Sequence, residues 1–154
     1  RVLLFGLGSS LLVAHDTYLK FLRLDKPCMV TDDWHAQLLS ARNATPDYLG
    51  IVFSYSGQTV EVIQCMEALK ANGVPIIAIT RYSPSRVAEL ADYNLYIAAN
   101  ESLFRNGAMS SRIAQLNVVD ILYTAYASRH YEETLRALTR THIYKPGEPE
   151  EIIP

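Results

Sequence analysis

A chain of 154 residues is long enough for one domain with a substantial hydrophobic core and leaves little room for a second domain. Hydrophobic residues make up 49% of the sequence and charged residues 19%, a balance that excludes a disordered or fibrous protein. The formal net charge is -2 and there is no basic run, so this segment is a poor candidate for direct nucleic-acid binding. No apolar run reaches the length of about 20 residues that a membrane-spanning helix needs.

Apolar runs and helical patterns alternate along the chain. The expected strands are residues 2–7, 28–31, 49–54, 75–80 and 93–98, and the expected helices are residues 10–24, 34–41, 58–71, 83–91 and about 110–130. This alternation predicts an α/β protein, a three-layer α/β/α sandwich around a five-stranded parallel sheet. The long last helix is expected to face the core with Ile113, Leu116, Val119, Leu122 and Tyr126.

The two ends of the chain lead to separate expectations. Residues 1–143 are assigned to the folded domain, and residues 144–154, rich in Pro and Glu, are expected to form a loose, solvated tail. At the other end, residue 1 is an arginine and the chain opens inside a predicted strand. A preceding segment of a longer protein is therefore expected.

Two polar loops follow predicted strands. The first is Gly6-Leu7-Gly8-Ser9-Ser10, and the second runs from Ser54 to Thr59. In an open parallel sheet, ligands bind beyond the carboxyl ends of the strands, near the point where the strand order reverses. If the first and third strands are neighbours, both loops face one crevice and can hold one ligand from two sides. The alternative is that both loops are ordinary Gly/Ser starts of helices.

The second loop has the chemistry of an anion site. A strand that leads into a helix through such a loop leaves backbone N–H groups at the positive end of the helix dipole. The hydroxyls of Ser54, Ser56 and Thr59 can add hydrogen bonds, and Gly57 lets the backbone approach the anion closely. No Lys or Arg lies in the loop. We therefore expect neutral donors and the helix dipole to hold the phosphate of a small metabolite.

A nucleotide is an alternative ligand. The first loop begins like a dinucleotide-binding fingerprint, but Leu11 stands where the third glycine belongs. Asp32 and Asp33 lie at a suitable distance along the chain to be ribose partners. No P-loop lysine follows either glycine loop, which argues against ATP or GTP.

The pair of loops resembles the SIS (sugar isomerase) domain, a phosphosugar-binding module of several enzymes and regulators. The resemblance lies in Gly6-x-Gly8-x-Ser10 and, more specifically, in Ser54-x-Ser56-Gly57-x-Thr59 leading into Glu61. It covers residues 1 to about 130. The segment from Asn100 to Leu116, together with Asp33-x-His35-x-Gln37, looks like the corresponding segments of RpiR-type transcriptional regulators.

The resemblance implies a flavodoxin-like sheet, a homodimer or higher homo-oligomer, no cofactor, and an effector-sensing role for a phosphorylated sugar or sugar acid. In RpiR-type regulators a helix-turn-helix domain precedes the SIS domain, so DNA would be bound only through an N-terminal domain absent from this sequence. The implied ligand and phosphate contacts are Ser9, Ser10, Ser54, Ser56, Gln58 and Thr59, and further candidate sugar contacts are Gly8, His35, Tyr55, Gly57 and Glu101.

An aldose–ketose phosphosugar isomerase is the alternative function. Glu101 would then be the base that moves a proton between adjacent sugar carbons. The competing interpretation of Glu101 is a solvated loop acid or a contact to a sugar hydroxyl. His15, His130 and His142 have no metal-like spacing, so no metal site is expected. Cys28 and Cys65 show no pairing pattern and are expected to be reduced thiols of a cytoplasmic protein.

Overall fold

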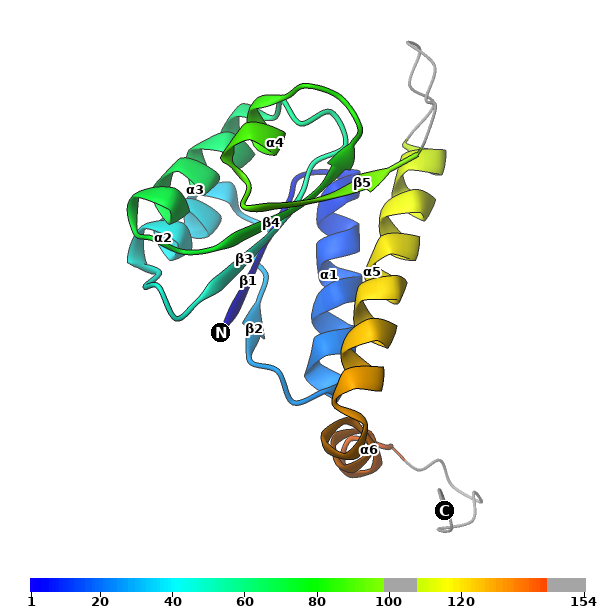
Figure 1. Cartoon of the computed structure of the whole chain (residues 1–154). Coiled ribbons are helices and arrows are strands. Elements are labelled where there is room, and N and C mark those ends of the chain that lie inside the picture. Colours follow the sequence, from blue (N-terminus) through cyan, green and yellow to red (C-terminus); the bar gives the residue numbers. More distant parts are fainter. Residues whose placement is uncertain (99–107, 144–154) are drawn as a thin grey trace.

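The computed structural model describes residues 1–98 and 108–143 (Figure 1). The strands are β1 (Val2–Phe5), β2 (Cys28–Met29), β3 (Leu49–Phe53), β4 (Ile76–Arg81) and β5 (Tyr93–Ile97). The helices are α1 (Ser9–Arg23), α2 (Trp34–Asn43), α3 (Val60–Ala71), α4 (Arg86–Leu90), α5 (Met109–Arg129) and α6 (Tyr131–Arg140). Within the described ranges, no helix combines the length and the hydropathy needed to cross a bilayer.

The five strands form one parallel sheet in the order β2-β1-β3-β4-β5. The predicted flavodoxin-like α/β fold is confirmed. The chain moves outward from β1 to β2, then returns across β1 to β3 and continues to β5. The strand order therefore reverses between β1 and β3, where Phe5 lies opposite Val52. That reversal point is where an open parallel sheet binds its ligands.

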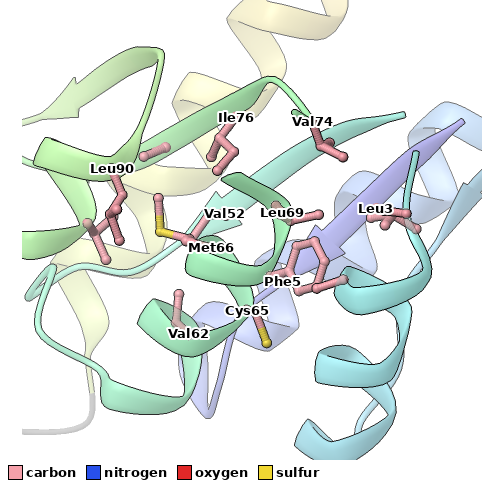
Figure 2. Close-up of a cluster of buried hydrophobic side chains, with 14 residues drawn as sticks. Leu3, Phe5, Val52, Val62, Cys65, Met66, Leu69, Val74, Ile76 and Leu90 are labelled. Carbon is pink, nitrogen blue, oxygen red and sulfur yellow. The ribbon is translucent and has the colours of Figure 1, made fainter. Parts of the chain in front are cut away.

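Helices cover both faces of the sheet, with α2, α3 and α4 on one side and α1 and α5 on the other (Figure 1). Successive residues of a strand point to opposite faces, so each strand contributes to both cores. Leu3 and Phe5 of β1 pack under α3 with Met66 and Leu69, as Figure 2 shows. Leu4 faces the α1 side together with Phe53 of β3. The central strands are buried on both sides, which explains their continuous apolar sequences.

Helix α6 was not predicted from the sequence. Its segment is mostly polar, but it buries Ala137 and Thr134. Two ion pairs attach it to the turn after α1: Lys26 lies 2.6 Å from Glu133, and Arg140 lies 2.7 Å from Asp25. These partners are more than 100 residues apart in sequence, so local periodicity gives no signal for this contact. The predicted tail, residues 144–154, lies outside the described residues.

The predicted core face of α5 is partly wrong. Val119 is buried as expected, but the other buried positions are Ser111 and Gln115, and Ile113 is 67% exposed. Leu116 and Leu122 are partly buried against the same core as Val119, as expected, so Ile113 is the misplaced member of the predicted stripe. The polar residues on the true buried stripe lie toward the carboxyl edge of the sheet, where the candidate site is found.

Candidate functional site

The loops after β1 and β3 open at the same edge of the sheet. Because β1 and β3 are neighbouring strands, paired up to Phe5 and Val52, the loops that follow them start side by side at this edge. The expectation that these two strands are neighbours is confirmed. One compact ligand at this edge can therefore contact both loops.

A buried glutamine holds the first loop in place. The Oε1 atom of Gln37 accepts a hydrogen bond from the Gly6 N–H (3.3 Å), and its Nε2 atom donates to the Gly6 carbonyl (3.0 Å). The same Nε2 donates to the carbonyl of Thr31 (2.9 Å), at the end of the β2 loop. Gln37 is 3% exposed. It fixes the backbone at which the first loop turns from β1 toward α1.

The end of the first loop presents two serines at the start of α1. Gly8 is the N-cap residue with φ of 55°, a conformation that glycine adopts without strain. Ser9 and Ser10 form the first turn of the helix, and both are half-buried. The Ser10 hydroxyl lies 3.4 Å from the side-chain amide of Gln115 on α5. This contact joins the first loop to the buried polar stripe of α5.

The second loop brings its hydroxyls together. Ser54 is buried, and its Oγ lies 3.5 Å from Oγ1 of Thr59. The Oγ of Ser56 accepts a hydrogen bond from the Gln58 N–H (3.3 Å), which shapes the turn. The Gln58 side chain is exposed. Four of the predicted ligand contacts therefore lie within one short turn: Ser54, Ser56, Gln58 and Thr59.

Gly57 is the tightest point of this loop. Its φ is +67°, and an added Cβ would overlap the Ser85 hydroxyl and lie 2.6 Å from the Ser85 Cβ. The Gly57 carbonyl accepts a hydrogen bond from the Val87 N–H (3.2 Å). The loop thus packs against the start of α4, and only glycine fits there. These contacts with α4 fix the shape of the second loop within the domain itself.

Among the described residues, side-chain caps are present at the starts of α2 and α4 and absent at the starts of α1, α3, α5 and α6. Asp33 caps α2 by accepting from the Ala36 N–H (2.9 Å), and Ser85 caps α4 by accepting from the Ala88 N–H (3.3 Å). In contrast, α1 and α3 begin at Gly8 and Thr59, which make no side-chain capping bond among the described residues. The uncapped start of α3 favours an anion beside the second loop. In α1 the N–H groups of Ser10 and Leu11 already donate to the carbonyls of Leu7 (3.2 Å) and Gly8 (3.0 Å).

One cation lies beside the second loop. The Arg81 guanidinium lies 5.8 Å from the ring centroid of Tyr55. The backbone N–H of Arg81 donates a hydrogen bond to the Tyr55 carbonyl (3.3 Å). Arg81 is the last residue of β4 and was not singled out from the sequence. The Tyr55 ring is buried in the core with Phe53 and Ile79. Its burial favours a packing role over the predicted sugar contact.

His35, Asp32 and Asp33 lie at or just before the start of α2, outside the two loops. His35 is exposed in the first turn of α2, where its ring packs against Trp34 with centroids 4.3 Å apart. The strand before α2 is β2, separated from β3 by β1. Glu101, the candidate isomerase base, lies outside the described residues. The predicted ribose partners are engaged elsewhere: Asp33 caps α2, and Asp32 contacts His15.

The described residues contain no other reactive cluster. No group of three or more His, Cys, Asp or Glu side chains in residues 1–98 and 108–143 could hold a metal ion. Cys28 and Cys65 are free thiols. Burial raises the pKa of the Cys65 thiol to about 11, so this residue is a packing group and not a nucleophile.

Gln37, Gln115 and Ser85 support the site, and none was assigned a role from the sequence. From the sequence, Gln37 is named only within the pattern Asp33-x-His35-x-Gln37, with no role of its own. In the structure it is a buried residue of α2. Gln115 and Ser111 stand on a helical stripe with Val119, and polar residues on a buried stripe are a detectable sign of a nearby polar site. Ser85 gives no such sign, because its contact with Gly57 depends on tertiary packing.

The strand order and the paired loops define a flavodoxin-like α/β domain with two polar loops at its switch point. The chain belongs to the SIS domain family, because the SIS domain model matches residues 1–125. The chain is also 41% identical over 137 residues to the uncharacterized HTH-type transcriptional regulator TTE0211 of Caldanaerobacter subterraneus subsp. tengcongensis. It is 37% identical over 137 residues to the uncharacterized HTH-type transcriptional regulator YbbH of Bacillus subtilis.

These matches cover 89% and 88% of this chain but 49% and 48% of the two regulators, so the chain spans about half the length of the curated relatives. Among solved structures, NanR of Vibrio vulnificus, complexed with ManNAc-6P, is similar with a TM-score of 0.85 and 25% identity, over 91% of this chain and 53% of NanR. The sugar isomerase domain of an RpiR transcription factor from Sphaerobacter thermophilus matches with a TM-score of 0.79 and 24% identity, over 90% of this chain and 76% of that one. At 24% identity, the similarity to the Sphaerobacter thermophilus domain shows only that the two chains share a fold.

Proposed function

We propose that this domain binds a phosphorylated sugar or sugar acid and acts as the effector-sensing part of a bacterial transcriptional regulator of the RpiR type. The observation that supports this best is the start of α3, which has no side-chain cap and lies beside the hydroxyls of Ser54, Ser56 and Thr59. Two further findings agree with it. NanR, the similar structure, holds ManNAc-6P, and the curated relatives are HTH-type regulators.

In this proposal the phosphate binds over the second loop and the sugar extends toward the first. The hydroxyls of Ser54, Ser56 and Thr59 and the N–H groups at the start of α3 donate to phosphate oxygens. Ser9 and Ser10 would donate from the first turn of α1, and Gln58 and the Gly8 backbone would meet sugar hydroxyls at the rim. Neutral donors hold the phosphate with moderate affinity, as suits a metabolite signal that must dissociate.

The regulator would bind DNA through a helix-turn-helix domain outside this segment. Ligand binding would change DNA affinity by linkage, because a ligand shifts any equilibrium whose two states bind it differently. We further propose that the domain works in the cytoplasm as a homodimer, so that one binding event can alter the relation between two DNA-binding domains.

Alanine substitutions in the second loop test the proposal. Ser54→Ala and Ser56→Ala should each weaken phosphosugar binding by about 1–2 kcal/mol per lost hydrogen bond, a factor of roughly 5 to 30 in dissociation constant. Isothermal titration calorimetry gives the affinity, and thermal unfolding shows that the domain remains folded. Ser40→Ala is the matched control, because the Ser40 hydroxyl donates to the Ala36 carbonyl within α2 (2.8 Å), away from the loops. If both loop variants bind the phosphosugar as tightly as the unaltered chain does, the second loop is not part of the binding site.

A further inference from the structure

Helix α5 carries a buried glutamine beside the first loop. Gln115 is 1% exposed, and Ser111, one turn earlier on the helix, is also buried. Val119, one turn further on, is apolar and packs in the core. A side-chain amide has two N–H donors and an oxygen that accepts hydrogen bonds, and its burial costs free energy unless these groups find partners. The partner of the Gln115 amide therefore indicates what this residue does.

That partner is Ser10, a predicted ligand contact. Helices α1 and α5 lie side by side (Figure 1), and the Ser10 hydroxyl lies 3.4 Å from the Oε1 atom of Gln115 and 3.4 Å from its Nε2 atom. Within residues 1–98 and 108–143, no other side chain forms a hydrogen bond with the Gln115 amide. The side-chain hydrogen bonding of Gln115 is therefore directed at the candidate site.

Ser10 can offer its hydroxyl to a ligand, but not its backbone N–H. The N–H groups of Ser10 and Leu11 are already engaged with the carbonyls of Leu7 and Gly8. A hydroxyl has a single hydrogen to donate, and its oxygen can accept at the same time. A ligand oxygen receives that hydrogen only if the protein does not hold it elsewhere. The group that faces the Ser10 hydroxyl from inside the protein therefore decides how well Ser10 binds a ligand.

We propose that Gln115 is a positioning residue that prepares the Ser10 hydroxyl to donate to the phosphosugar. Before binding, the Ser10 hydroxyl donates to Oε1 of Gln115. When a ligand oxygen takes this hydrogen, the Ser10 oxygen accepts a hydrogen bond from Nε2 instead. Both amide atoms lie at the same distance from the hydroxyl, so the exchange requires no movement of either helix. This inference rests on the proposed function, which supplies the ligand oxygen.

A double-mutant cycle tests whether Gln115 acts through Ser10. The probe is the sugar phosphate that the unaltered chain binds most tightly among hexose, pentose and amino-sugar phosphates. Ser10→Ala and Gln115→Leu should each raise its dissociation constant about tenfold, and the double variant should bind no more weakly than either single variant. Thr17→Val is the matched control. Thr17 is a buried polar residue of α1 whose hydroxyl donates to the Val13 carbonyl (2.8 Å), so its loss should leave the dissociation constant unchanged.

The side-chain N–H signals of Gln115 report the exchange of hydrogen bonds directly. In a proton–nitrogen NMR spectrum they are identified by their absence from the spectrum of Gln115→Leu. Saturation with the same sugar phosphate should shift these signals in the unaltered chain, because Nε2 becomes a donor to Ser10. The signals should stay in place in Ser10→Ala, which has no hydroxyl to accept from Nε2. A residue that only fills space in the core would show no such difference.

Three results would overturn the inference: additive losses in the double variant, full affinity of Gln115→Leu, and Gln115 signals that do not shift. Circular dichroism shows whether each variant is folded, and Gln115→Met replaces Gln115→Leu if the leucine variant does not fold. A chain that binds a sugar phosphate with additive losses rejects the role of Gln115 alone. A chain that binds no sugar phosphate rejects the proposed function, and this inference with it.

Discussion

Gly57→Ala is expected to remove measurable phosphosugar binding and to lower the free energy of unfolding by about 2–4 kcal/mol. Two costs add at this position. Alanine is strained at φ of +67°, and its Cβ would collide with the Ser85 side chain, which is buried at the start of α4. Either the loop or α4 must move, and both movements change the positions of Ser56 and Thr59. Urea unfolding and calorimetric titration measure the two effects.

Gly73→Ala is the matched control for this substitution. Its φ is +69°, nearly the same as that of Gly57, but an added Cβ would meet only Pro46 at an ordinary 3.7 Å. Strain should therefore cost about 1 kcal/mol with no effect on ligand affinity. If both variants lose the same stability and Gly57→Ala still binds phosphosugar normally, the packing of the second loop against α4 has no part in binding.

Gln37→Leu is expected to cost about 3 kcal/mol of unfolding free energy, the second large effect. Leucine removes three hydrogen bonds and leaves buried groups of Gly6 and Thr31 without their partner. The first loop should then become mobile, and ligand affinity should fall although Gln37 itself is buried beneath the loop. Chemical denaturation gives the stability, and titration of the folded variant gives the affinity.

Gln64→Leu serves as the comparison, because Gln64 is an exposed residue of α3. Such a surface change should alter stability by less than about 0.5 kcal/mol. A Gln37→Leu variant as stable as Gln64→Leu would mean that the first loop holds its shape without the glutamine. If Gln37→Leu lowers the free energy of unfolding but binds the ligand with unchanged affinity, Gln37 contributes to stability and not to binding.

The parts of the fold with strong local signals could be predicted from the sequence. The strand before Ser54 is a continuous apolar run, and the Asn72-Gly73 stop of α3 and the Asp33 cap of α2 have characteristic residues. The sequence alone could not establish that β1 and β3 are neighbours, because strand order depends on contacts that no local pattern encodes. The structure supplies that order, and with it the meeting of the two loops.

The residues that support the loops could not be assigned in the same way. Gln37 bonds to Gly6 across 31 residues, and Gly57 packs on Ser85 through tertiary contact. Helices α1 and α5 show a limit of predicting buried residues from hydrophobic periodicity. Leu22 and Ile113 fit a core-facing pattern, yet both are exposed. Periodicity detects apolar positions along a helix, but it cannot tell which of them enter the domain core.

Calorimetric titration with sugar phosphates tests the central claim most directly. The chain is titrated with hexose, pentose and amino-sugar phosphates, with each unphosphorylated sugar, and with a dinucleotide. We predict that at least one sugar phosphate binds, that its unphosphorylated sugar binds about 100-fold more weakly or not at all, and that the bound compound is recovered unchanged. Binding of the dinucleotide but of no sugar phosphate would contradict the account, and conversion of the bound sugar phosphate to its isomer would show an enzyme in place of a sensor.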